Sequence, residues 1–64
     1  MDNYTIIGIA EGFVKAESEE QIIEAWQHLV DTGMCWTLQG WFGKVAQGMI
    51  DDGILTIKKE KNKN

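Results

Sequence analysis

The side chains best suited to chemistry in this sequence are one thiol, one imidazole and a cluster of tryptophans and glycines. Cys35 is the only cysteine of the 64 residues, and His28 is the only histidine. A structural zinc site needs four such ligands, and a cysteine nucleophile needs a histidine or an acid beside it. We therefore expect no catalytic residue, no metal site and no cofactor, although a helix that begins next to Cys35 would lower the pKa of its thiol.

The tryptophans and glycines concentrate in "DTGMCWTLQGWFGK", residues 31 to 44. Gly40 and Gly43 fall inside a predicted helix, where each costs about 1 kcal/mol relative to alanine. Their bare backbone lets another group approach closely. That group is either a helix, of this chain or of a second copy, or a small ligand. Near a helix N-terminus the backbone N–H groups favour an anion such as a nucleotide phosphate.

In the ligand hypothesis, Trp36 and Trp41 wall a groove whose floor is the glycine backbone. Lys44 would add positive charge, the glutamines would hydrogen-bond polar edges, and an indole would stack on a base. Helix packing against the glycines is the simpler explanation, with the tryptophans in the core or at an interface. The candidate ligand-binding residues are Trp36, Thr37, Gln39, Gly40, Trp41, Gly43, Lys44 and Gln47.

The best-defined element around this stretch is a helix predicted over residues 18–32. Ser18 and Gln21 fit a capping box, in which the Ser18 hydroxyl accepts from the Gln21 amide and the Gln21 side chain reaches back. Gly33 can take the left-handed conformation that ends the helix. On the polar side, His28 follows Glu24 by four residues, which predicts a surface pair. The apolar stripe consists of Ile22, Ile23, Trp26, Leu29 and Val30.

A third helix is predicted to begin after Thr37, its N-cap, and to stop at Gly53. Trp36 and Trp41 occupy the two positions of a hydrophobic staple around that N-cap. The apolar face of this helix would hold Leu38, Trp41, Phe42, Val45, Met49 and Ile50.

The first segment has two interpretations. Residues 4–10, "YTIIGIA", have the β-branched content of a strand that could pair with "ILTIK" at 54–58. They also show a helical apolar face that Asp2 or Asn3 would cap, and a lone two-stranded ribbon is marginal in water. We favour the helix. The prediction is an all-α, three-helix domain over residues 1–57 with a short extended C-terminal arm, followed by a basic flexible tail at 58–64.

Charge and size restrict the partners of this chain. Residues 1–57 carry nine acidic side chains and two lysines, hence −7, whereas the tail carries four lysines and one glutamate. An acidic body without arginine argues against DNA or RNA, and the apolar runs are too short for a membrane span or a signal peptide. A lone cysteine suits a reducing cytosol. Because neither a disulfide nor a metal can support so small a core, we expect a homo-oligomer.

One part of the sequence resembles a known group of proteins. Residues 18–54 contain "HLVDTG", then "WTLQG", Phe42 and the pair Gly43–Lys44. This order is similar to that of short, functionally uncharacterised tailed-phage proteins with an H-L-I-D-T-G type run, W-x-L-Q-G, an aromatic residue and G-R. Lys44 stands where that group usually has arginine, which weakens the case for bidentate phosphate recognition. The resemblance implies a phage origin, the cytoplasm of a host bacterium as the setting, and no established activity.

These features predict a small non-enzymatic phage accessory protein that acts by binding. One hypothesis is counter-defence, in which a groove around residues 36–47 sequesters a small anionic nucleotide signal. The alternative is a protein–protein inhibitor or regulator that docks an acidic helical face on a host bacterial protein.

Overall fold

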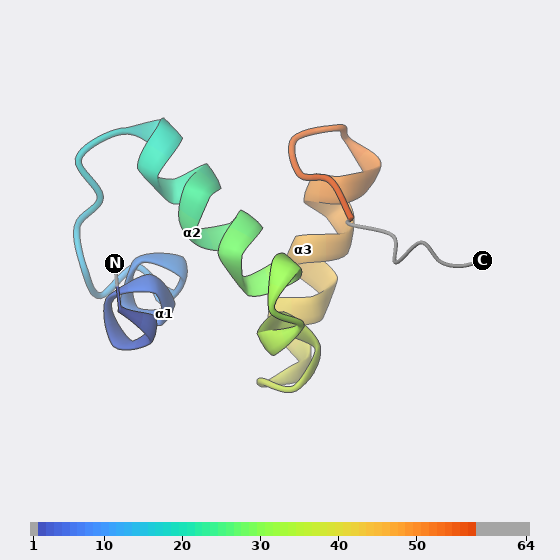
Figure 1. Cartoon of the computed structure of the whole chain (residues 1–64), viewed down its shortest axis with the longest axis horizontal. Helices are drawn as coiled ribbons and strands as arrows, with labels where there is room; N and C mark the ends of the chain where they lie inside the picture. The colour runs from blue at the N-terminus through green and yellow to red at the C-terminus, as the bar shows by residue number, and fades with distance from the viewer. Residues whose placement is uncertain (1, 58–64) are drawn as a thin grey trace.

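Within residues 2–57, three α-helices and one short 3₁₀ turn make up the structure. The computed structural model describes residues 2–57, so the tail predicted at 58–64 lies outside the described residues. The elements are α1 (Asn3–Glu11), α2 (Glu19–Asp31), the turn η1 (Met34–Trp36) and α3 (Gly40–Asp51). Figure 1 shows α2 running between α1 and α3. The predicted all-α, three-helix fold is confirmed, and residues 54–57 follow α3 without helix or strand.

The first segment is helical, so its interpretation as a strand is wrong. Asp2 is the N-cap of α1, and its Oδ1 accepts a 2.9 Å hydrogen bond from the Thr5 backbone N–H. At the other end, Gly12 takes a left-handed conformation with φ 86°, which reverses the chain. The reversal brings Val14 back over Gly8, where an added Cβ would lie 2.5 Å from Val14 Cγ2. Glycine at position 8 is therefore what permits this close approach.

The N-terminus of α2 follows the predicted capping pattern in part. Ser18 Oγ accepts a 3.2 Å hydrogen bond from the Gln21 N–H, as expected. Gln21 Oε1 accepts at 2.8 Å from the Glu17 N–H, instead of the Ser18 N–H that a capping box uses. Gly33 has φ 79°, and its N–H donates to the Val30 carbonyl, which confirms the predicted end of the helix.

α3 begins later than predicted, and Thr37 is not its N-cap. Residues 34–36 form η1, and Thr37 Oγ1 donates to the Met34 carbonyl at 2.9 Å, which closes this turn. The N-cap of α3 is Gln39, whose side chain makes no capping hydrogen bond. The hydrophobic staple predicted for Trp36 and Trp41 is therefore wrong, because it requires an N-cap at residue 37.

The core lies where α2 meets α1 on one side and α3 on the other. It consists of Ile6, Ile9, Ala25, Trp26, Leu29, Val30, Cys35, Phe42, Ala46 and Leu55. The apolar faces predicted for the second and third helices are confirmed in part, because Ile22, Trp41 and Val45 are exposed. None of the helices within residues 2–57 has the length and apolar character that crossing a membrane requires.

The segment after α3 is attached to α2 by one side chain. Gln27 Nε2 donates to the Thr56 carbonyl at 2.7 Å, and the Thr56 N–H donates to Gln27 Oε1 at 3.1 Å. The side-chain amide thus supplies the donor and acceptor that a neighbouring strand would otherwise offer. Leu55, one residue earlier, is buried in the core. The C-terminal arm is therefore a packed part of the fold up to this point.

Candidate functional site

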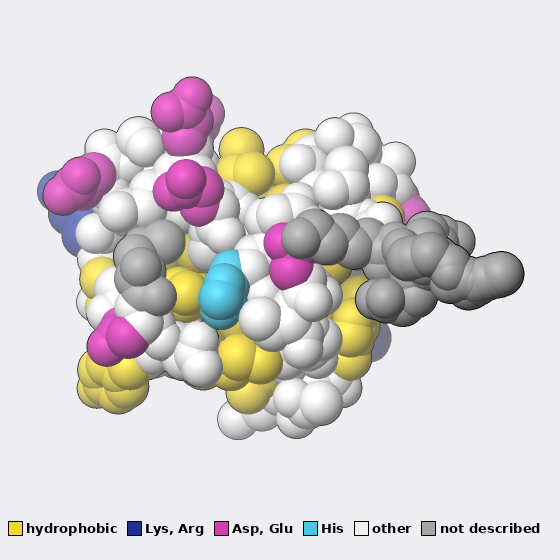
Figure 2. All heavy atoms as spheres, in the orientation of Figure 1, with side chains coloured by type: hydrophobic (Ala, Val, Ile, Leu, Met, Phe, Trp, Pro, Cys, Tyr) yellow, Lys and Arg dark blue, Asp and Glu magenta, His cyan; other side chains and the backbone are white. Residues whose placement is uncertain are grey.

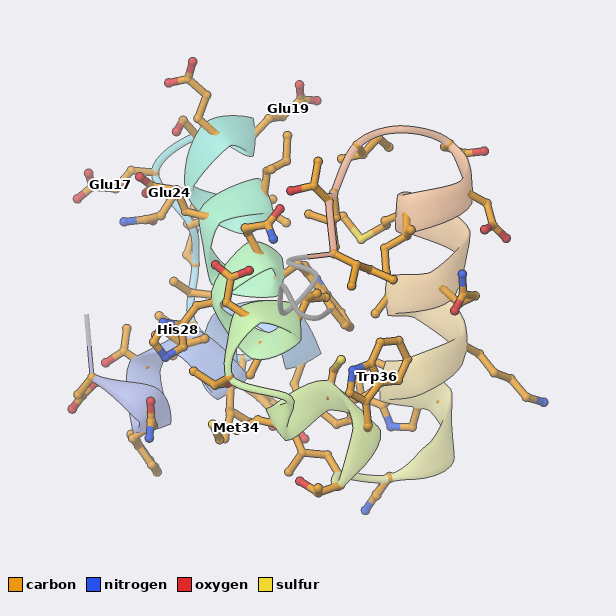
Figure 3. All side chains as sticks on the ribbon, turned by 45° about the vertical axis from the view of Figure 1, so that its right-hand side comes forward. Glu17, Glu19, Glu24, His28, Met34 and Trp36 are labelled. Carbon is orange, nitrogen blue, oxygen red and sulfur yellow. The ribbon has the colours of Figure 1, made fainter. Side chains whose placement is uncertain are left out.

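The residues predicted to bind a ligand lie around the first half of α3, but they do not form one cluster. Figure 3 shows Trp36 projecting from η1 toward α3. A Cβ built on Gly43 would lie 3.4 Å from Cε3 of the Trp36 indole, which is contact distance. The neighbours of the Gly43 backbone are thus the Trp36 side chain and the Cys35 carbonyl oxygen, both from the short 3₁₀ helix η1 of the same chain.

Trp41 belongs to a different aromatic group. Its ring stacks on Phe42 with centroids 3.9 Å apart and meets Trp26 edge-on at 6.3 Å. Its Nε1–H donates to Gln39 Oε1 at 3.2 Å. Because each helical residue turns the chain by about 100°, positions 41 and 43 are about 200° apart. The two exposed indoles therefore lie on different sides of α3 and do not face each other across the glycines.

The polar members of the predicted site are also dispersed. Thr37 hydrogen-bonds within η1, and Gln47 Nε2 donates to Asp51 Oδ1 at 3.0 Å. Lys44 is exposed. A Cβ built on Gly40 would meet nothing within 4 Å in the part of the chain that the structure describes. The predicted anion site thus reduces to the open backbone at the start of α3 and an ammonium group one turn later.

Neither the thiol nor the imidazole is placed as the sequence predicts. Cys35 is buried, and burial raises the pKa of its thiol, whereas proximity to a helix start predicts a lowered pKa. The reason is that α3 begins only at residue 40, so Cys35 lies within η1. His28 Nε2 lies 3.3 Å from Asn3 Oδ1 of α1, in place of the predicted pair with Glu24. Among residues 2–57, no three His, Cys, Asp or Glu side chains gather to hold a metal ion.

A shallow concave surface of about 440 Å³ lies along α2 where it passes α1. Its lining, hereafter the acidic groove, is Ile6, Gln21, Glu24, Gln27, His28 and Asp31. Glu24, His28 and Asp31 recur at spacings of four and three, which places them on one side of the helix. Figure 3 shows Glu24 and His28 on the same side of α2, and Figure 2 shows carboxylates distributed around the histidine on this face. Gln27 borders the groove and also donates to Asp31 Oδ1 at 2.9 Å.

A second hollow, of about 210 Å³, lies on α1. Its lining, hereafter the aromatic groove, is Tyr4, Ile7, Gly8, Glu11, Phe13 and Val14. Tyr4 and Phe13 are 84 % and 85 % exposed, so both rings project into solvent. Gly8 lets Val14 pack across the helix, which builds one wall of the hollow.

Sequence reasoning missed the composition of both grooves. The helical spacing of residues 21, 24, 28 and 31 predicts an acidic helical face. It does not predict that α1 packs beside this face. For the aromatic groove the available signal was Gly12, since a glycine after a helical segment predicts a chain reversal. That signal does not predict that Phe13 would remain outside the core.

The similarities of the chain to known proteins are few. A family model described as Domain of unknown function (DUF7417) matches residues 9–62. The match includes α2, η1 and α3 and only the end of α1. No curated protein and no solved structure matches the chain. The family description states no activity, so function has to be argued from the surfaces themselves.

Proposed function

The chain belongs to that family of unknown function, and we propose that it is a non-enzymatic binding protein whose acidic groove takes a basic segment of a partner protein. The observation that carries the proposal is a concave surface framed by carboxylates, with no lysine or arginine among its lining residues. Glu24 and Asp31 line the groove, and no lysine or arginine occurs between residues 16 and 43. A Lys or Arg side chain of a partner would supply the complementary charge.

The edge of the acidic groove is ordered before any partner arrives. Gln27 is held from two directions, by the backbone of Thr56 and by the Asp31 carboxylate. His28 is held near Asn3 of α1. Groups that are already fixed lose little conformational entropy on binding, so more of the interaction energy is available for affinity.

We place this binding in the cytoplasm of a phage-infected bacterium, where the protein would inhibit or regulate a host protein. The support is the resemblance of residues 18–54 to tailed-phage proteins together with the acidic groove. Nucleic acid is disfavoured as the partner because phosphates would be repelled by Glu24 and Asp31.

Neutral substitutions in the groove test the proposal. The double variant Glu24→Gln/Asp31→Asn removes two charges from the lining and keeps an oxygen at position 31 that can accept from Gln27. The control Glu17→Gln/Glu20→Gln removes two charges from exposed positions outside that lining. We expect the unmodified chain and the control to capture the same host protein at about 0.1 M salt, with the groove variant binding at least about tenfold more weakly. Binding should also weaken at higher salt, since exposed charges are screened.

Two results would count against the acidic groove. Equal affinity of the unmodified chain and the groove variant would show that the partner binds elsewhere. Equal loss in the groove variant and in the control would show that net charge matters and the groove does not.

A second candidate function is the sequestration of a small anionic nucleotide at the start of α3, as a counter-defence activity. The observation that favours it is the open backbone at Gly40, behind an N-cap without a side-chain hydrogen bond, with exposed Lys44 one turn later. Native mass spectrometry of the protein purified from infected cells separates the two candidates. A retained small molecule that Lys44→Gln releases supports nucleotide binding, and a retained protein supports the first proposal.

A further inference from the structure

We propose that the aromatic groove is a self-association surface, into which a second copy of this chain inserts its own exposed aromatic side chain. The surface lies on α1, and the proposal is independent of partner binding at the acidic groove. Tyr4 and Phe13, 84 % and 85 % exposed, are the two most exposed large apolar side chains among residues 2–57. Aromatic residues are enriched among the side chains that dominate the binding energy of interfaces.

The patch contains both a hollow and the groups that would fill it. A symmetric dimer brings the same surface of both copies together, so that surface must be complementary to itself. Here the hollow of about 210 Å³ lies directly beside Tyr4 and Phe13. A cavity of about 150 Å³ accommodates a benzene ring. One copy can therefore place its Phe13 ring in the hollow of the other and receive the partner ring in return.

Charge favours this surface over that of α2 as the place where two copies of the chain meet. Residues 2–15, which include the α1 N-cap Asp2, carry Asp2, Glu11 and Lys15, hence −1. Residues 16–39 carry five acidic side chains and no basic one, and residues 40–57 carry two acids and one lysine. Two identical acidic bodies repel each other. That repulsion is weakest around α1 and α3, at −1 each, and of these two it is α1 that carries the two most exposed large apolar side chains, so self-association is favoured there.

The available area suits a weak dimer. A stable interface typically buries about 800 Å² on each partner. An aromatic side chain buries roughly 150–250 Å², so Tyr4 and Phe13 together supply about half of that area. Ile7, Gly8, Glu11 and Val14 line the same hollow and would add further area. We expect a dimer that forms at tens of micromolar, with a dissociation constant in the micromolar range.

Sedimentation velocity of the full chain between about 5 and 200 µM tests this proposal. The unmodified chain should approach twice its 7.2 kDa monomer mass as concentration rises. Phe13→Ala should raise the dimer dissociation constant at least about tenfold. Its helical circular dichroism should be unchanged, because the ring is outside the core. Val45→Ala, which shortens an exposed apolar side chain on α3, is the control and should leave the dimer intact.

A charge substitution at Lys15 provides a second test of the dimer in the same sedimentation experiment. Lys15→Glu lowers the net charge of residues 2–15 from −1 to −3 and should weaken the dimer as strongly as Phe13→Ala. Lys44→Glu makes the same change of charge on α3 and should have a much smaller effect. A chain that stays monomeric at 200 µM overturns the proposal, as does a dimer that Phe13→Ala and Lys15→Glu leave unchanged. Weakening by Lys44→Glu equal to that by Lys15→Glu overturns it too, because general repulsion would then explain the result.

Discussion

Trp26, Trp36 and Trp41 have the same side chain and three different environments. Trp26 is 4 % exposed and lies in the core beside Trp41 and Phe42, whereas Trp36 and Trp41 are 48 % and 39 % exposed. At the scale of single residues, the helical spacing of Trp26 predicts its burial correctly. Trp36 lies in η1, outside α3, and Trp41 lies in the first turn of α3, so the helical period of a longer third helix does not predict the exposure of Trp36.

We expect Trp26→Ala to unfold the protein or nearly so. Truncation of a buried aromatic side chain costs about 3–5 kcal/mol, and small domains have total stabilities near the low end of about 5–15 kcal/mol. His28→Ala is the comparison, since it removes one partly exposed contact to Asn3 and should cost about 1 kcal/mol or less. Urea titrations followed by circular dichroism measure both. A larger loss for His28→Ala than for Trp26→Ala would contradict the packing described for α2.

At the scale of elements, two glycines inside helices have opposite surroundings, one crowded and one open. Gly8 of α1 is in a crowded position, where an added Cβ would lie 2.5 Å from Val14 Cγ2. Gly48 of α3 is open, with nothing within 4 Å of an added Cβ in the described part of the chain. Helix propensity favours alanine over glycine equally at both sites. Their surroundings therefore decide whether a glycine-to-alanine substitution raises or lowers the free energy of unfolding.

We predict that Gly48→Ala stabilises the protein by about 0.5–1 kcal/mol and that Gly8→Ala destabilises it by roughly 1–3 kcal/mol. The gain comes from the reduced freedom of the unfolded chain, and the loss comes from displacing Val14. Midpoints of urea unfolding, compared at constant slope, give both values. If Gly8→Ala were stabilising as well, Val14 would not pack across Gly8 as found here, and the aromatic groove would lose a wall.

At the scale of the whole molecule, contacts between distant parts of the sequence are few, and Gln27 makes an important one. Its amide holds Thr56, a residue 29 positions away, by two hydrogen bonds. We expect Gln27→Ala to release residues 54–57 from α2 while the helices stay folded. Amide hydrogen exchange should accelerate at Thr56, whose N–H donates to Gln27, and the global stability should fall by roughly 1–2 kcal/mol. Unchanged exchange at Thr56 would show that burial of Leu55 alone holds the segment.

The sequence alone determined the number of helices, the boundaries of α2 and the core position of Trp26. These features depend on local chemistry: Ser18 accepts from a backbone amide three residues away, Gly33 supplies the left-handed residue that ends the helix, and apolar residues repeat at the helical period. The same local rules supported a helix over a strand for residues 4–10, and Asp2 caps that helix.

Only the tertiary structure decided where α3 begins, which glycine is covered and which surfaces are concave. Thr37 is a good N-cap by residue type, yet its hydroxyl donates to the Met34 carbonyl because Thr37 directly follows η1. Trp36 then lies against Gly43, a contact that no spacing rule predicts. Both grooves likewise need two segments at a defined relative placement, α1 beside α2 and Val14 over α1. Periodicity and capping act within a few residues of the chain, whereas these contacts depend on how whole elements pack.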